Sequence, residues 1–293
     1  MAIPRSRVIQ SIPVTAPQET GKKEVTPRRI KSAAPHGLAL FRIAFGITLT
    51  CQLLFVLRGA AQFELVEWLL LLGGILMSAL FTAGAWFPYT AVALICIYGF
   101  EGSILLRAGA AANTFTSMYQ VSLFVPLLLL LVWSRADRAY SHAMYLKYGS
   151  FSEWEEVRAL PVTILKIVIS IAYLYIATVV LWQPVWMSGA RMRSALIGSL
   201  GTTIGARLAR MPFPPFFFNS ALSVTKAFVL MLPFSLWIRS VRKFTIILGF
   251  VLQLFIGLLL GEWWLFALAS GMVLFVNPNE VRLFVEKKMK KNG

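Results

Sequence analysis

Residues 171–189 read IAYLYIATVVLWQPVWMSG and contain the pattern that decides the fold. The apolar part approaches the length of about 20 residues that a helix needs to cross a bilayer. Trp182, Pro184 and Trp186 end the run, and tryptophan favours the membrane–water interface. Residues 189–211 beyond it contain arginines and are too polar to cross. The stretch therefore predicts a spanning helix that ends at a membrane face, beside a basic surface segment.

The whole chain has the composition of a helical membrane protein. Hydrophobic residues make up 58% of its 293 positions, above the globular norm of roughly half. Cys51 and Cys96 lie within apolar runs, where a free cysteine behaves as a small hydrophobe, so we expect no disulfide framework. His36 and His142 lie outside these runs, which argues against a histidine-bound metal or haem within the bilayer. We therefore expect an all-α, polytopic protein with no metal site and no cofactor.

Apolar runs predict about eight transmembrane helices, of which the third and eighth are the weakest. They fall at residues 37–57, 68–86, 89–106, 115–133, 162–182, 216–238, 244–260 and 265–276. Charged and aromatic residues alternate between spans 4 and 5 and between spans 5 and 6, which predicts interfacial helices there. Residues 37–278 form the predicted transmembrane domain. Residues 1–36, with five prolines, and 279–293 are predicted basic cytoplasmic tails, the first of them disordered.

The net charge of +16 has a distribution typical of a membrane protein. Nineteen of the 28 Lys and Arg residues fall on one side of the predicted spans and six on the other. The positive-inside rule then places both termini in the cytoplasm. Anionic lipid headgroups are the expected partners of these basic segments. No basic–aromatic module of a nucleic-acid-binding type is present, so we expect no nucleic-acid partner.

Few charged residues fall within the spans. Arg42 is one turn into the first, where snorkelling as a cytoplasmic anchor is favoured over a buried functional charge. Lys226 is about ten residues into the sixth. It is either a mid-membrane amine able to act as a base, or it snorkels because the span begins later. The acidic run 153–156 is read as a solvated face and not as an acid/base pair.

Four arginines gather on the side that the positive-inside rule disfavours: Arg191, Arg193, Arg207 and Arg210. Arginine pairs well with phosphate and carboxylate, so the group indicates a phosphate, carboxylate or acidic-peptide ligand. A headgroup-binding loop explains it equally well. The sequence shows no Ser–His–Asp motif, phosphate loop or paired metal-binding carboxylates, so no catalytic residue is predicted.

Four motifs carry a resemblance to a known family. They are LALFRIAFGI at 38–47, YLYIATVVLWQPVWMSG at 173–189, FFFNSALSV at 216–224 and LGFVLQLFIGLLLGEWWLFALASGMVLFVNP at 248–278. Their order resembles the HTTM superfamily of membrane proteins, which is related to the transmembrane part of vitamin K-dependent gamma-carboxylase. The C-terminal half is most similar to the SdpB-type proteins of bacterial peptide-toxin operons.

The resemblance also marks departures from a carboxylase. The place of the family's catalytic lysine holds Val180, the place of a common histidine holds Gln253, and that of an acidic residue falls near Leu232. A lysine-based carboxylase reaction is therefore not implied, and whether the chain is an enzyme stays open. The residues that a shared outer cavity would retain are Trp182, Trp186, Gly189, Asn219, Ser220 and Gln253.

By resemblance, the expected function is to assist maturation, modification or export of a co-produced secreted peptide or protein. Two alternatives stay open: a non-enzymatic accessory or scaffold subunit bound to other membrane subunits, and a transporter of small molecules or lipids. The candidate ligand- or partner-binding residues are Trp182, Trp186, Gly189, Arg191, Arg193, Asn219, Ser220, Lys226 and Gln253.

Overall fold

The computed structural model describes residues 32–57, 65–107, 114–151, 153–178, 180–182, 184–198, 202–260, 264–277, 279–281 and 283. These residues belong to one compact unit, 31–293. The parts of the two basic tails at 1–31 and 284–293 lie outside the described residues, so the predictions for them stay predictions.

The described residues are almost entirely helical, which confirms the predicted all-α class. The long helices are α1 (His36–Leu57), α2 (Leu65–Ala83), α3 (Phe87–Arg107), α4 (Thr114–Ser134), α6 (Ala159–Thr178), α9 (Pro215–Ser235) and α10 (Arg242–Leu260). The shorter helices are α5 (His142–Tyr148), η2 (Val180–Trp182), η3 (Pro184–Trp186), α7 (Gly189–Ile197), α8 (Thr203–Arg210), α11 (Trp264–Ser270) and η4 (Gly271–Phe275). The strands β1 (Ser32–Ala33) and β2 (Val157–Arg158) form an antiparallel pair.

Among the described residues, five helices are long and apolar enough to cross a membrane: His36–Leu54, Leu65–Ala83, Ala159–Thr178, Phe216–Ser235 and Arg242–Leu260. Shorter apolar helices cover Phe87–Gly99, Ser122–Ser134 and Leu265–Phe275. These lengths and compositions indicate a membrane-associated helical protein.

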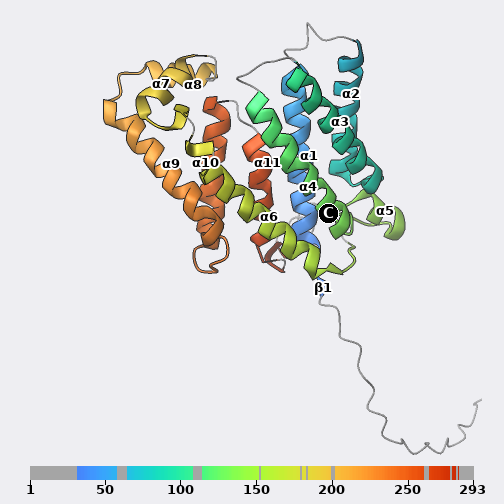
Figure 1. Ribbon diagram of the computed structural model, residues 1–293. Coiled ribbons are helices and arrows are strands. Elements are labelled where there is room, and N and C mark those ends of the chain that lie inside the picture. The colour runs from blue at the N-terminus through green and yellow to red at the C-terminus, as the bar shows by residue number, and fades with distance from the viewer. Residues whose placement is uncertain are drawn as a thin grey trace, which may run out of the picture. The chain divides into compact units, whose positions relative to one another are not determined.

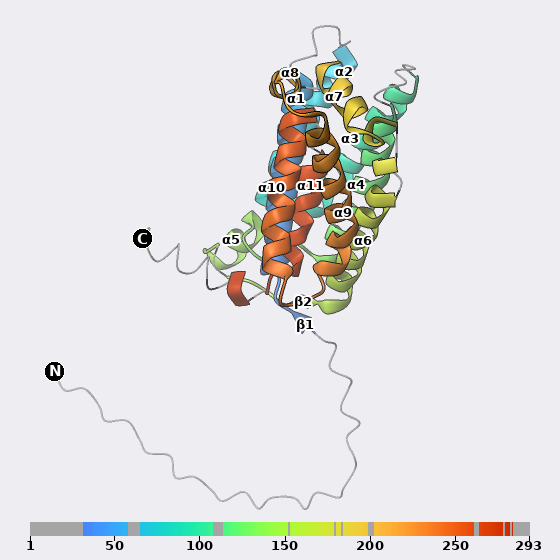
Figure 2. The ribbon, with the colours of Figure 1, turned by 90° about the vertical axis from the view of Figure 1, so that its left-hand side faces the viewer.

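The long helices run between two distinct ends of the folded unit. The strand pair and the turn between α9 and α10 lie at one end, which we call the strand end (Figure 1). Helices α7 and α8 lie at the opposite end, at the top of Figures 1 and 2. Together with η2, η3 and the coil to Pro214 they form what we call the ledge.

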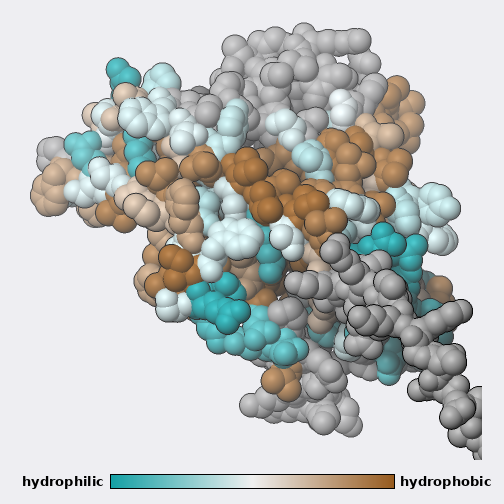
Figure 3. All heavy atoms as spheres, turned by 60° about the horizontal axis from the view of Figure 1, so that its bottom comes forward, coloured by the Kyte–Doolittle hydropathy of each residue, from teal (hydrophilic) through white to brown (hydrophobic). Residues whose placement is uncertain are grey.

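The core forms around α1, which packs against α2, α4, α11 and η4. Aromatic rings fill it: Phe45 meets Phe124 edge-on at 5.3 Å between centroids and Phe81 at 6.5 Å. Hydrophobic residues remain exposed on the outward faces of several helices, including Leu69, Leu72 and Leu76 of α2. Figure 3 shows brown hydrophobic atoms in a belt between more hydrophilic teal areas, as a lipid-facing surface requires.

Two predicted boundaries differ from the structure. The folded unit already includes Ser32–Ala33, which pair with β2, and His36, which is 2% exposed. The fifth predicted span ends early, because α6 stops at Thr178 and two short 3-10 turns follow. Pro184 is the physical reason, since it has no N–H and its ring would clash with the carbonyl of Val180 in a continuing α-helix.

Candidate functional site

The ledge brings together two of the quoted motifs through one close contact. The backbone N–H of Gly189 donates to the side-chain oxygen Oδ1 of Asn219, at 2.6 Å. A Cβ added to Gly189 would lie 2.5 Å from the Asn219 nitrogen and 2.7 Å from the carbonyl carbon of Phe218. Only glycine permits this approach of α7 to α9, so Gly189 and Asn219 are packing residues here.

Polar side chains cap helices α7 and α8 and fix where each begins. Ser188 caps α7, and its Oγ accepts from the N–H of Arg191 at 3.3 Å. Thr202 caps α8, and its hydroxyl accepts from the N–H of Gly205 at 3.1 Å. Such side chains satisfy amide groups that a helix start leaves without a partner.

Thr202 also anchors the ledge to the end of α10. Its hydroxyl donates to the carbonyl of Leu258 at 2.5 Å, and its N–H donates to the carbonyl of Leu259 at 3.0 Å. Carbonyls in the last turn of a helix have no intrahelical donor, so these bonds satisfy them away from water. The ledge is therefore held to α9 at one edge and to α10 at another.

The four predicted ligand-binding arginines divide into two kinds. Arg193 donates from Nε to the carbonyl of Ala209 at 2.7 Å and from Nη2 to that of Met211 at 3.3 Å. Its guanidinium also lies 5.8 Å from the centroid of the Phe218 ring. Arg193 thus holds the end of α8. Three other arginines of the ledge are exposed: Arg191, Arg207 and Arg210.

The positive charge of the ledge has no local counter-charge in sequence. Residues 157–261 contain no Asp or Glu, and this range includes the whole ledge with α6, α9 and α10. The exposed arginines present unneutralised guanidinium groups, which suit a carboxylate or a phosphate. The same range offers no carboxylate for proton transfer.

Lys226 and Trp182 meet across α9 and η2. The Lys226 Nζ lies 5.7 Å from the centroid of the Trp182 ring, in a cation–π arrangement. Trp182 is 67% exposed. Helix α9 begins at Pro215 and its apolar span at Phe216, so Lys226 follows about three turns of helix. Lys226 therefore lies well inside the helix.

The remaining predicted site residues are divided between the core and the surface. Gln253 is buried and donates from Nε2 to the Tyr173 hydroxyl at 2.6 Å, while its Oε1 has no partner among the described residues. Trp186 belongs to the hydrophobic core, and Ser220 is exposed. Val180 lies in η2 between α6 and Trp182.

Sequence reasoning missed a second polar site, at the strand end. Arg42 is 0% exposed, so the predicted snorkelling anchor is wrong. Its Nη1 donates to the carbonyl of Ala136 at 2.9 Å and its Nη2 to that of Tyr140 at 2.7 Å. A Cβ on Gly84, whose φ is +67°, would lie 2.6 Å from Arg42 Nη1. The partners of Arg42 are backbone carbonyls, which no sequence motif reveals.

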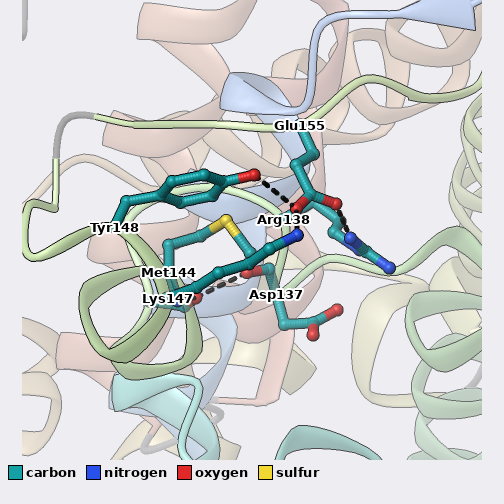
Figure 4. Close-up of polar contacts among 7 residues, drawn as sticks. Asp137, Arg138, Met144, Lys147, Tyr148 and Glu155 are labelled. Carbon is teal, nitrogen blue, oxygen red and sulfur yellow. Dashed lines mark hydrogen bonds and ion pairs between the residues drawn. The ribbon is translucent and has the colours of Figure 1, made fainter.

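Carboxylates balance the basic residues near this second site, as Figure 4 shows. Glu155 forms ion pairs with Arg138 and Lys147 and accepts a hydrogen bond from the Tyr148 hydroxyl at 2.9 Å. The Glu155 side chain is 22% exposed. The prediction of a solvated acidic face is wrong for Glu155, whereas Glu153 and Glu156 are exposed.

Ser141 orders the same segment through its hydroxyl. The Ser141 hydroxyl donates to the carbonyl of Asp137 at 2.5 Å and accepts from the N–H of Met144 at 3.2 Å, which begins α5 (Figure 4). The ring of His36 packs 5.4 Å from that of Tyr140 and 5.1 Å from that of Trp154. These contacts fix the segment between α4 and α6 against α1.

Within the ranges that the structure describes, no three His, Cys, Asp or Glu side chains gather where they could hold a metal ion. Comparison with known proteins gives no further guide, because no family model, curated protein or solved structure matches the chain. The chemistry that the described residues do offer is anion binding by exposed arginines on the ledge.

Proposed function

We propose that the chain is an eight-span inner-membrane protein of HTTM type, closest to the SdpB-like proteins, with both termini cytoplasmic. The five long apolar helices supply five spans, and α3 and α4, each 21 residues long, supply two more. Helix α11 with η4 is the eighth. Most of the Lys and Arg residues outside the ledge lie toward the strand end, so the positive-inside rule makes this end cytoplasmic. The ledge then faces outward.

The segment between α4 and α6 lies at the cytoplasmic interface in this arrangement. Helix α5 exposes Tyr145, Leu146 and Tyr148 next to Lys147. Aromatic and aliphatic side chains beside a lysine suit the boundary between acyl chains and anionic headgroups. The ledge helices α7 and α8 are the interfacial helices of the opposite face.

The proposed function is to bind a co-produced secreted peptide or protein on the ledge and assist its maturation, modification or export. One observation carries the proposal: Arg191, Arg207 and Arg210 are exposed within a range that has no acidic residue. An arginine binds a carboxylate through up to two parallel hydrogen bonds. Acidic side chains or the C-terminal carboxylate of the client would supply the complementary charge.

Binding and presentation are better supported than a reaction on the peptide. The position of a family lysine is Val180, and the buried pair Gln253 and Tyr173 offers only an amide and a phenol. The guanidinium of Arg193 is already engaged with the carbonyls of Ala209 and Met211.

The test replaces the three exposed ledge arginines together, as R191Q/R207Q/R210Q, in nanodiscs of neutral lipid. Binding of the secreted peptide encoded beside the protein should weaken by about tenfold or more, since each charge-assisted hydrogen bond contributes roughly 1.5–3 kcal/mol. The matched control, R135Q/R239Q, removes exposed arginines at the strand end and should leave binding unchanged.

A cellular experiment tests the role itself. Deleting the protein should block processing or secretion of the client, read by mass spectrometry of culture and cell fractions. The triple variant should reproduce that block at normal expression. Unchanged processing and secretion after deletion would contradict the proposal.

One observation favours a second candidate function, that of an accessory subunit which assembles with other membrane proteins. Lys226 is a charged residue deep within an apolar helix that has an exposed face. Charged residues at such depth usually pair or line a pathway.

A further inference from the structure

Lys226 lies near the middle of α9 by residue count. Ten residues separate it from Phe216, where the apolar span begins, and nine from Ser235, where it ends. At a rise of about 1.5 Å per residue it is about 15 Å and 14 Å from the two ends. In the proposed eight-span arrangement lipid phosphates lie beyond those ends, which places Lys226 at the depth of the hydrocarbon core.

No neighbouring element supplies a carboxylate to Lys226. Helix α9 packs against α6, α7 and α10, and all of these fall within the range 157–261 that has no Asp or Glu. The neighbour shown for the ammonium is the ring of Trp182, 5.7 Å from Nζ. A ring face partly compensates the charge but leaves the ammonium able to accept an anion.

Part of the exposed surface beside Lys226 carries small side chains, alongside the larger exposed residues Val224 and Leu230. Ser220, Ser223 and Ala227 are exposed and recur at helical spacing on the side of α9 away from its buried residues Leu222 and Val229. Small residues at such spacing let the backbone of another helix approach closely in a membrane. In the first half of α9 and near its middle, this surface therefore combines close approach with a positive charge.

We propose that this face of α9, formed by Ser220, Ser223, Lys226 and Ala227, binds a transmembrane helix of a partner protein through a carboxylate that pairs with Lys226. The depth of Lys226 favours a helix-borne carboxylate over a lipid phosphate. The unneutralised charge requires an anion, and the small side chains suit a helix. This inference rests on the proposed eight-span arrangement and specifies the partner of the second candidate function; it is independent of client binding, because the surface lies on α9 and not on α7 and α8 of the ledge.

The experiment uses the full-length protein in phosphatidylcholine liposomes and a synthetic transmembrane helix as probe. The probe is a Leu–Ala peptide with one Glu at its centre, and the matched peptide has Gln there. Energy transfer between a dye on the protein's N-terminus and a dye on the peptide reports association. The Glu peptide should bind about three- to tenfold more tightly than the Gln peptide, as polar contacts between membrane helices allow.

Variants assign that preference to Lys226. K226M should abolish it, K226R should retain it, and K226E should transfer it to a peptide with a central Lys. K166M is the matched control, because Lys166 is also a span lysine beside an aromatic ring, 5.5 Å from the centroid of Phe275, and should leave the preference intact. If K226M does not fold, as judged by size-exclusion chromatography, K226R and K226E still test the proposal.

Three outcomes would overturn the proposal. The first is equal binding of the Glu and Gln peptides, and the second is a Glu preference that persists in K226M and K226E. The third combines two results: the wild type shows no Glu preference, and K226M loses phosphatidylglycerol that the wild type retains in native mass spectrometry. That combination would assign Lys226 to the binding of a lipid phosphate. The ledge variant R191Q/R207Q/R210Q should retain the Glu preference, so failure of the client-binding function and failure of this inference are distinguishable.

Discussion

The strand end and the ledge use arginine in the same way but balance its charge differently. At each end arginine donates to backbone carbonyls: Arg42 and Arg242 at the strand end, and Arg193 at the ledge. At the strand end Glu155 pairs with Arg138 and Lys147, and Glu280 pairs with Lys243 at 2.8 Å. The ledge has no acidic residue. The strand end therefore neutralises much of its own charge, whereas the ledge leaves positive charge exposed for a ligand.

Arg42 and Arg193 also differ in burial, and this difference sets their expected energetics. Arg42 is fully buried, and Arg193 is partly exposed. A buried guanidinium loses its hydration, which only good hydrogen bonds can offset. The Nε of Arg42 has no partner among the described residues. Burying Arg42 therefore costs desolvation free energy, and its hydrogen bonds fix the α4–α5 connection against α1.

The largest effect is expected from Arg42→Met. The substitution removes the hydrogen bonds that Arg42 donates to the carbonyls of Ala136 and Tyr140, at about 1–3 kcal/mol each. The midpoint of thermal unfolding in mild detergent should fall by many degrees, and the yield of folded protein should drop. Arg135→Met is the control: Arg135 is exposed in the same connection and should change the midpoint little. Equal midpoints for the two variants would contradict the assigned role of Arg42.

Gly189→Ala is expected to have the next largest effect. The added methyl group would lie 2.5 Å from the Asn219 nitrogen and must push α7 away from α9. Overpacking of this kind costs about 1–3 kcal/mol, so the unfolding midpoint should fall. Gly73→Ala is the matched control, because nothing lies within 4 Å of a Cβ there. An alanine at Gly73 should be neutral or slightly stabilising, since it favours helix; a fall as large as that of Gly189→Ala would break the assignment.

Sequence patterns predicted the all-helical class and the membrane character because these depend on composition and on the length of apolar runs. They also predicted the ends of α6 and the start of α9 to within a few residues, from prolines and aromatic residues. The count of eight spans and the orientation stay predictions. Periodicity gives no information on which polar side chain reaches which backbone carbonyl, and the wrong prediction for Arg42 has this cause.

The candidate site was predictable only in part. The motifs around Gly189 and Asn219 marked two segments that do meet. The division between Arg193 and the three exposed arginines was not predictable, because it depends on where α8 ends relative to α7. For Lys226 the start of α9 at Pro215 agrees with the predicted start of the sixth span, and the choice between a mid-membrane amine and a snorkelling lysine stays a prediction.

Arg193→Gln and Arg207→Gln separate structure from binding on the ledge itself. Arg193→Gln removes the donors to Ala209 and Met211, so we expect a loss of about 1–2 kcal/mol in the free energy of unfolding. Arg207 is exposed, and its replacement should change stability by no more than about 0.5 kcal/mol. Arg207→Gln should instead weaken client binding, measured by titration in nanodiscs. If Arg193→Gln leaves stability unchanged, Arg193 belongs with the ligand-binding group after all.

The smallest effects are expected at the neutral pair Tyr173 and Gln253, which links α6 to α10 without any charge. Tyr173→Phe leaves the Gln253 amide buried without a partner and should cost about 1 kcal/mol. The double variant Y173F/Q253L replaces both partners by apolar groups and should return stability to within about 0.5 kcal/mol of the wild type. We expect the double variant also to bind the client peptide normally, because binding is assigned to the exposed arginines of the ledge. Normal stability with lost binding would instead place a ligand at Gln253, whose Oε1 finds no partner among the described residues, and would extend the functional site from the ledge into the membrane.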